Sequence, residues 1–146
     1  MTRRPFLPAV VCALALVGAG CGDDDNDTLS YEDTGTEIGD ICQTVSLDDL
    51  NGKPNNDVPV LEKAVPEFEQ AVQDVRDLDV DEELADTRDQ FADNADEQVA
   101  LLKEAQQIAE GGDQKAYRAK LDEGQPLGKE SDELASKLGA TACIDE

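Results

Sequence analysis

Residues 79–112 read DVDEELADTRDQFADNADEQVALLKEAQQIAEGG, and apolar side chains recur along this stretch at helical spacings. Side chains spaced in this way share one face of an α-helix. The face consists of Leu84, Phe91, Ala95, Leu102, Ala105 and Ile108. Asp79 and Glu82 have the spacing of a capping box, which predicts the start, and Gly111 and Gly112 predict the end. The stretch therefore predicts one long amphipathic helix.

A similar pattern precedes this helix. Asp57 predicts an N-cap with Pro59 in the first turn, and residues 53–56 are expected to form a loop. The apolar face is Leu61, Val65, Phe68, Val72 and Val75. Pro66 lies inside the pattern and should kink the helix or delay its regular part, because proline lacks an N–H and crowds the preceding turn.

The pattern also continues after residue 112. Asp113 predicts the N-cap of another helix, and Gly139 predicts its end. Its apolar face is Tyr117, Leu121, Leu134 and Leu138. Gly124, Pro126 and Gly128 weaken the middle of this helix, so we expect a bend or a break there.

A shorter pattern opens the folded region. Ile38, Ile41 and Val45 predict a short first helix that ends before the turn at Asn51–Gly52. Alternating strand patterns of useful length are absent from the sequence. The predicted fold class is therefore all-α, an up-down-up-down bundle of three long helices and a short first helix, over residues 38–146.

The first 21 residues have the features of an export signal. Arg3 and Arg4 precede a mostly apolar run at residues 6–17, and small residues lead to Cys21. This order predicts a signal peptide over residues 1–20. The apolar run is shorter than the roughly 20 residues that cross a bilayer, which argues against a membrane-spanning helix.

Ala19, Gly20 and Cys21 resemble the lipobox of bacterial lipoproteins, although Gly18 stands where that motif usually has Leu. The resemblance implies that Cys21 carries lipid, including palmitate, and anchors the chain at the extracytoplasmic face of the cell membrane. Ordinary secretory cleavage after Ala19 is the alternative and would give a secreted protein. Both the general and the twin-arginine export routes are open.

Residues 21–37 are expected to form a disordered acidic tether. Large apolar side chains are sparse there and follow no period, so the segment cannot offset the entropy that ordering costs. The predicted organisation is thus a signal peptide, a tether and one helical domain.

The cysteines support export. Cys12 lies in the predicted signal and Cys21 is the lipid site, which leaves Cys42 and Cys143 in the folded domain. An oxidising compartment favours a disulfide between them, and the predicted topology brings the first helix beside the end of the last. Two separate buried thiols are the alternative.

Four short motifs in residues 38–146 resemble small exported helical proteins and lipoproteins of high-GC Gram-positive bacteria. They are Ile41-Cys42, Pro66 within the second helix, Gly112-Asp113, and Leu138-Gly139 shortly before Cys143. The resemblance implies a disulfide-closed bundle and carries over no catalytic residue.

The charge restricts the partners. The chain has 35 acidic and 12 basic residues and a net charge of −23. Nucleic-acid binding is excluded because it needs a basic surface that releases counterions, and the basic residues here are scattered among acids. Anionic lipid headgroups are also repelled, so membrane association should come from the lipid anchor.

The composition also argues against catalysis. The chain has no His, so the commonest general base, Ser-His and Cys-His pairs, and imidazole metal ligands are missing. A phosphate-binding glycine loop is likewise absent from the sequence. We expect no enzyme activity and no cofactor.

One acidic cluster is a candidate for weak association with divalent cations. Asp86, Asp89, Asp93 and Asp96 recur at helical spacings and predict a carboxylate stripe facing solvent. A stripe along one helix spreads its oxygens instead of converging them on one ion. A solvated helix face is the favoured interpretation.

Together these features predict a lipid-anchored envelope protein with a non-catalytic binding or structural role, with an envelope protein as a candidate partner. The alternative is an acidic module that collects divalent or cationic ligands through its surface carboxylates. The third hypothesis is a secreted helical protein without lipid.

Overall fold

A computed structural model describes residues 28–144 of the chain. The predicted signal peptide, Cys21 and the tether up to residue 27 lie outside the described residues. Within the described range the structure is helical and contains no strand, apart from one isolated bridge between Leu29 and Val80. The elements are α1 (Tyr31–Cys42), α2 (Pro54–Asp77), α3 (Glu82–Glu110), α4 (Gln114–Glu123), α5 (Gln125–Lys137) and the short 3₁₀ helix η1 (Thr141–Cys143). The all-α prediction is confirmed for this part of the chain.

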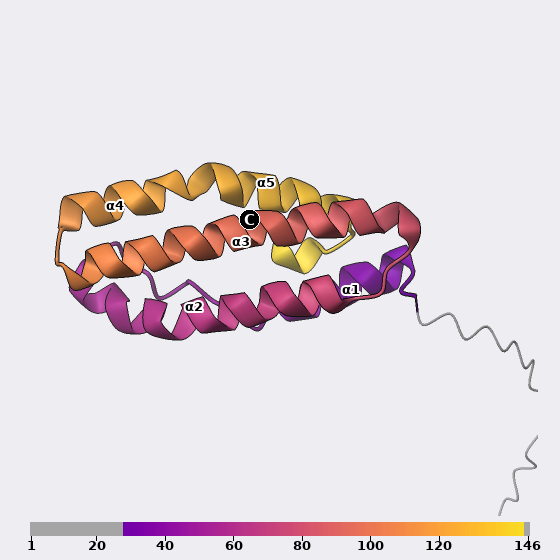
Figure 1. Cartoon of the computed structure of the whole chain (residues 1–146), viewed down its shortest axis with the longest axis horizontal. Coiled ribbons are helices and arrows are strands. Elements are labelled where there is room, and N and C mark those ends of the chain that lie inside the picture. Colours follow the sequence, from indigo (N-terminus) through magenta and orange to yellow (C-terminus); the bar gives the residue numbers. More distant parts are fainter. Residues whose placement is uncertain (1–27, 145–146) are drawn as a thin grey trace, which may run out of the picture.

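The helices pack around α3. Figure 1 shows α2 along one side of α3, while α4 and α5 follow one another along its other side. Helix α1 lies beside η1 at one end of the molecule, and an extended segment leads from α1 to the start of α2. Helices α2 and α3 have the most extensive contact.

Two apolar clusters fill the interior. The first combines residues of α1, α2, α3 and α5 and includes Ile38, Phe91 and Leu138. The second lies nearer the start of α2 and includes Leu61 and Tyr117. Phe68 packs against both clusters, so it links the two halves of the core. The apolar faces predicted from the sequence therefore point inward.

Helix α3 matches its prediction at the C-terminus and differs at the N-terminus. It ends at Glu110, before Gly111, and its predicted apolar face is buried or packed against the core. It begins at Glu82 with Asp81 as the N-cap, so the capping box predicted from Asp79 is wrong. The backbone carbonyl of Asp79 instead accepts a hydrogen bond from the N–H of Leu29 at 2.6 Å. This bridge keeps Asp79 outside the helix.

The break predicted in the last long helix is confirmed. Gly124 separates α4 from α5, and Gly139 follows the end of α5 with a φ of 76°. The Asp113 side chain accepts hydrogen bonds from the N–H groups of Lys115 and Ala116, as an N-cap should.

Helix α2 begins earlier than predicted. It starts at Pro54, so the expected loop at residues 53–56 is wrong and Asp57 is not the N-cap. Proline at the first helical position is favoured because its missing N–H would have no partner there in any case. Helix α2 continues without interruption through Pro59 and Pro66.

Helix α1 overturns the predicted boundary of the tether. It begins at Tyr31, so the boundary near residue 38 is wrong and residues 31–37 belong to the folded domain. Ser30 caps the helix by accepting a hydrogen bond from the N–H of Asp33, and Thr34 is fully buried. The buried residues of this part of α1 are Thr34 and Gly35, which are small and leave no hydrophobic period in the sequence.

Gly35 shows how close this contact is. A Cβ atom at Gly35 would lie 2.6 Å from both the carbonyl carbon and the carbonyl oxygen of Gly139. Two backbones can approach this closely only where one residue lacks a side chain. Gly35 therefore permits α1 to dock on the end of α5.

We expect Gly35→Ala to lower the free energy of unfolding by about 1 to 3 kcal/mol, because the added methyl must push α1 away from Gly139. Urea denaturation measures the change. The matched control is Gly128→Ala, where a Cβ would meet no atom within 4 Å and the helix should gain up to about 1 kcal/mol. Equal stability of the two variants would contradict the packing argument.

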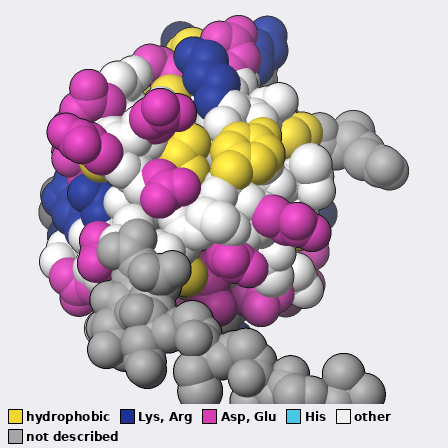
Figure 2. All heavy atoms as spheres, turned by 90° about the vertical axis from the view of Figure 1, so that its right-hand side faces the viewer, with side chains coloured by type: hydrophobic (Ala, Val, Ile, Leu, Met, Phe, Trp, Pro, Cys, Tyr) yellow, Lys and Arg dark blue, Asp and Glu magenta, His cyan; other side chains and the backbone are white. Residues whose placement is uncertain are grey.

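Acidic side chains cover much of the outside. Figure 2 shows one end of the molecule, where acidic groups surround a small apolar patch. Tyr31 at the start of α1 is the large apolar residue with high exposure among the described residues, at 51%. None of the described helices is both long and apolar enough to cross a membrane.

Candidate functional site

The segment between α1 and α2, residues 43–53, is named the strap here. Helix α1 ends at Cys42, so Val45 belongs to the strap and not to the first helix as predicted. The strap makes turns of its own, such as the hydrogen bonds from Thr44 to Ile41 and from Leu50 to Leu47. Its apolar residues Leu47 and Leu50 pack against the second core cluster.

The disulfide holds the N-terminal end of the strap. The sulfur atoms of Cys42 and Cys143 are bonded, and the two Cα atoms lie 5.4 Å apart. The two cysteines thus lie at disulfide distance, as the predicted pairing requires. The bond joins the last residue of α1 to η1, after the end of α5. The strap therefore starts from a covalently closed point of the domain.

A buried carboxylate holds the C-terminal end of the strap. Asp57 lies in the first turn of α2 and is fully buried. Its carboxylate accepts hydrogen bonds from the N–H groups of Asn51 and Lys53, each at 3.1 Å, and from the Tyr117 hydroxyl at 3.0 Å. Buried charges need partners of this kind. We call this group of residues the Asp57 clamp.

Tyr117 joins the clamp to α4 and is itself fully buried. Burial raises the pKa of the Tyr117 phenol, and the adjacent Asp57 carboxylate raises it further by accepting the proton in a hydrogen bond and by its charge. Tyr117 thus remains a hydrogen-bond donor to Asp57. The carbonyl of Gly52 also accepts from the side chains of Gln114 and Arg118 on α4, which fixes the same end of the strap.

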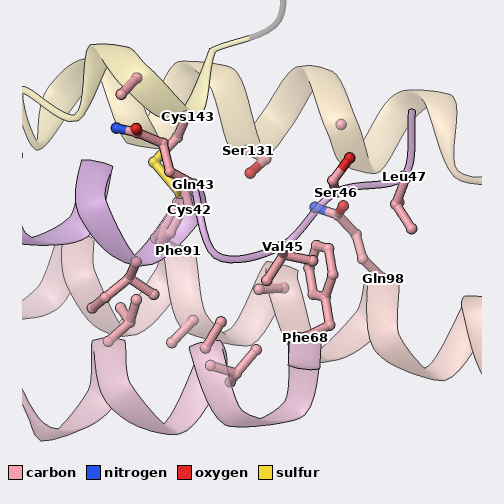
Figure 3. Close-up of a pocket in the computed structure, with 18 of the residues that line it drawn as sticks. Cys42, Gln43, Val45, Ser46, Leu47, Phe68, Phe91, Gln98, Ser131 and Cys143 are labelled. Carbon is pink, nitrogen blue, oxygen red and sulfur yellow. A yellow bond between two sulfur atoms is a disulfide. The ribbon is translucent and has the colours of Figure 1, made fainter. Parts of the chain in front are cut away.

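Between these two attachments lies a pocket of about 600 Å³. Figure 3 shows the strap crossing this space from the disulfide to Leu47. The volume of the pocket falls in the range of about 300 to 1,000 Å³ that is usual for small-molecule sites. The disulfide itself forms part of the wall.

The walls of the pocket combine apolar and polar surface. Helices α2 and α3 contribute most of the apolar wall, including Phe68, Val72, Phe91 and Ala95, and the strap adds Val45. Polar groups come from the strap, from α3 and from α5, and include Gln98 and Ser131. An apolar interior with a few polar groups is the usual composition of a ligand site.

The charged residues around the pocket are all acidic. Asp48 on the strap and Asp132 on α5 border it, and no Lys or Arg is among its lining residues in the described structure. The Asp48 carboxylate accepts a hydrogen bond from the Ser46 hydroxyl at 3.1 Å. The pocket therefore presents negative charge and no positive charge to a ligand.

The buried amide of Asn94 contacts Gln98, one of the polar side chains that line the pocket. The Asn94 side chain is 6% exposed, and its oxygen accepts a hydrogen bond from Gln98 at 2.7 Å. Its Nδ2 group is buried without a hydrogen-bond partner in the described structure. The Asn94 oxygen thereby holds one of the polar side chains of the pocket in place.

The acidic stripe does not converge on a cation site. Arg76 on α2 pairs with Asp93 at 2.6 Å and with Asp96 at 2.8 Å, and Arg88 pairs with Asp89 at 2.7 Å. The remaining member, Asp86, is exposed. Residues 28–144 contain no group of three or more His, Cys, Asp or Glu side chains placed to share a metal ion.

We expect calcium to raise the melting temperature no more than sodium chloride at the same ionic strength. The reason is that Asp93 and Asp96 already pair with Arg76 and that the stripe does not converge its oxygens on one ion, so calcium acts on it by screening alone. Thermal unfolding followed by circular dichroism checks this. A rise specific to calcium would support the alternative that the protein collects divalent cations.

The structure thus brings together Cys42 and Cys143 among the predicted site residues, whereas Cys21 lies outside the described residues. Sequence reasoning missed the strap, the Asp57 clamp and the pocket. The sequence indicates the clamp only weakly, because an aspartate two residues before a proline suits a helix N-cap as well as a buried carboxylate. No family model, curated protein or solved structure was found to match the chain.

Proposed function

We propose that the chain is a lipid-anchored protein on the extracytoplasmic face of a bacterial cell membrane, with a non-catalytic role as a binding protein. The observation that carries the proposal is the Cys42–Cys143 disulfide, which closes the domain and also forms part of the pocket wall. Disulfides are typical of oxidising compartments outside the cytoplasm. The same bond thus supports both the location and the binding site.

The anchor in this proposal is lipid on Cys21. Arg3 and Arg4, the apolar run and the small residues before Cys21 support it. With a net charge of −23, the protein surface is repelled by an anionic membrane. This favours a lipid, and not the charge of the protein surface, as the attachment to the membrane. Loss of Arg3 and Arg4 with the signal makes the remaining chain more acidic still.

The proposal includes an up-down-up-down arrangement in which α1 with the strap forms the first segment and α4 with α5 forms the last. The short connection at residues 78–81 and the turn before Gln114 support antiparallel neighbours. This order places the strap across the bundle, with its two ends held by different helices.

A binding role is favoured over catalysis by the residues of the pocket. They include neither His nor Lys nor a free thiol, so Ser-His and Cys-His pairs and a nucleophilic lysine are missing from the described site. The apolar wall and the scattered polar groups suit the recognition of a small molecule. Delivery or presentation of that molecule to an envelope partner is consistent with an anchored domain.

The anchor is tested by comparing the native protein with a Cys21→Ser variant, both expressed in an exporting bacterium. We expect the native protein to enter the detergent phase on phase separation and to carry a diacylglycerol mass on Cys21. The variant should remain in the aqueous phase. A native protein that is cleaved after Ala19 and stays aqueous would establish the secreted alternative, and an uncleaved one would overturn both.

A further inference from the structure

The residues that line the pocket beneath the strap indicate the chemical class of its ligand. We propose that the pocket binds an amphipathic small molecule with an apolar body and a cationic amine head, an inference that rests on the binding role proposed above. The apolar body is argued from the wall of the pocket, and the cationic head from its acidic border.

The apolar body follows from the helices that enclose the pocket. Phe68 on α2 and Val45 and Leu47 on the strap are half-buried and line a space of about 600 Å³, and the buried core residues behind them complete its apolar wall. Burying an apolar group there releases water from both surfaces and contributes roughly 25 cal/mol per Å². A ligand without such a body would leave the accessible apolar parts of Phe68, Val45 and Leu47 in contact with water.

The cationic head follows from the charges at the border. Asp48 and Asp132 lie on different elements, the strap and α5, and neither forms an ion pair with a Lys or Arg within the described part of the chain. This differs from Asp93 and Asp96, which both pair with Arg76. A fatty acid or a phosphate would meet repulsion at Asp48 and Asp132, because no positive charge lines the pocket.

The surface potential favours the same class. A chain with a net charge of −23 concentrates cations near its surface and slows the approach of anions. Attraction by the whole surface does not select one site, however. Selection needs carboxylates beside an apolar cavity, and Asp48 and Asp132 are in that position.

The strap gives the ligand a way in. Its ends are held by the disulfide and by the Asp57 clamp, whereas its middle, residues 45–50, forms no backbone hydrogen bond to α2, α3 or α5 in the described structure. Segments held by a few apolar contacts open at low cost in free energy. The strap can therefore rise over the pocket without unfolding the bundle.

The test uses N-phenyl-1-naphthylamine, a neutral apolar dye whose fluorescence rises in apolar sites. The full chain carrying Cys21→Ser serves as the background for all variants, so that no detergent is present. We expect saturable binding of the dye. Gly128 borders the pocket with open space around its Cβ position, so Gly128→Leu should weaken dye binding while the matched variant Gly128→Ala should not.

Head-group preference is then measured by displacing the dye with dodecylamine, dodecanol and dodecanoate, which share one chain and differ in charge. We expect dodecylamine to displace the dye at about tenfold lower concentration than dodecanoate, with dodecanol between them. The double variant Asp48→Asn/Asp132→Asn should remove the advantage of the amine over the alcohol. The control Asp86→Asn/Asp122→Asn changes the net charge equally at exposed positions away from the pocket and should retain it.

The outcomes separate the two proposals. Failure of the dye to bind saturably, or binding that ignores Gly128→Leu, overturns the pocket as the binding site. Dye binding with equal displacement by the three dodecyl compounds leaves the binding role intact and overturns the cationic ligand class. An amine advantage that both double variants reduce equally assigns it to general surface charge and also overturns that class.

Discussion

Replacing Cys42 and Cys143 together by alanine is expected to lower the free energy of unfolding by roughly 4 to 5 kcal/mol. The bond joins residues separated by 101 positions, and a cross-link that closes a loop of about 100 residues restricts the unfolded chain by about 4.7 kcal/mol in the chain-entropy model. A domain of this size has a total stability of about 5 to 15 kcal/mol. The loss would therefore leave the domain marginal.

Urea unfolding of the two proteins measures this loss. A reducing agent supplies the control, because it should destabilise the wild-type protein by a similar amount and leave the alanine variant unchanged. Hydrogen exchange at residues 43–47 should also accelerate in the variant, since the strap loses its attachment beside the pocket. A loss below about 1 kcal/mol would show that the bond contributes little to the stability of the domain.

Asp57→Ala is expected to cost about 3 kcal/mol, since it removes the shared acceptor of three hydrogen-bond donors, one of them buried and two part-buried. These are the N–H groups of Asn51 and Lys53 and the hydroxyl of Tyr117. Each unpartnered buried donor costs about 1 to 3 kcal/mol. Asp49→Ala is the matched control, because Asp49 is an exposed acid of the same strap and should change stability by less than about 0.5 kcal/mol.

Tyr117→Phe tests the other side of the clamp through its dependence on pH. The pKa of Tyr117 is raised in the folded protein, so the folded state keeps its proton at a pH where the unfolded tyrosine, with a pKa near 10.0, loses it. The contribution of this group to stability is therefore fully present below pH 10 and declines as pH rises above it.

We expect the wild-type protein to lose stability between about pH 10 and pH 12 more steeply than Tyr117→Phe. Urea unfolding across this range provides the measurement. At neutral pH the phenylalanine variant should already be less stable by about 1.5 to 3 kcal/mol, because one hydrogen bond to a carboxylate is missing. Parallel pH profiles for the two proteins would remove Tyr117 as the titrating group.

These experiments also separate stability from binding. The disulfide and the Asp57 clamp hold the two ends of the strap, so variants at either end should change access to the pocket as well as the free energy of unfolding. Variants at Asp48 and Asp132 alter the charge at the pocket border, where neither residue pairs with a Lys or Arg in the described structure. We expect them to change ligand preference and leave stability nearly unaffected.

Much of the fold could be predicted because its determinants are local. The period of apolar residues in α3, the break at Gly124 and the cap at Asp113 each depend on neighbours within a few turns. The disulfide was predictable because the proposed signal and lipid site account for Cys12 and Cys21 and leave one pair. Charge and composition narrowed the functional classes without reference to shape.

The errors arose where contacts join residues that are distant in sequence. Helix α1 begins at Tyr31, and in its first turns Thr34 is buried and Gly35 lies against Gly139; small residues such as these give no periodic signal. Asp57 was predicted to be an N-cap from its neighbours in the sequence. In the structure its carboxylate accepts a hydrogen bond from Tyr117, which is 60 residues away. The pocket is formed by the strap with α2, α3 and α5, so no single segment indicates it.

The sequence alone determined the helical class, the pairing of Cys42 with Cys143, the strong negative charge and the expectation of an exported, lipid-anchored chain. Only the tertiary structure decided where the first helix begins, that Asp57 is buried, and that an apolar pocket with acidic residues at its border lies beneath the strap. The physical reason is the distance along the sequence between the residues that determine each property. Helical period, capping and net charge are properties of neighbouring residues or of composition, whereas burial and cavities exist only after separate segments have packed together.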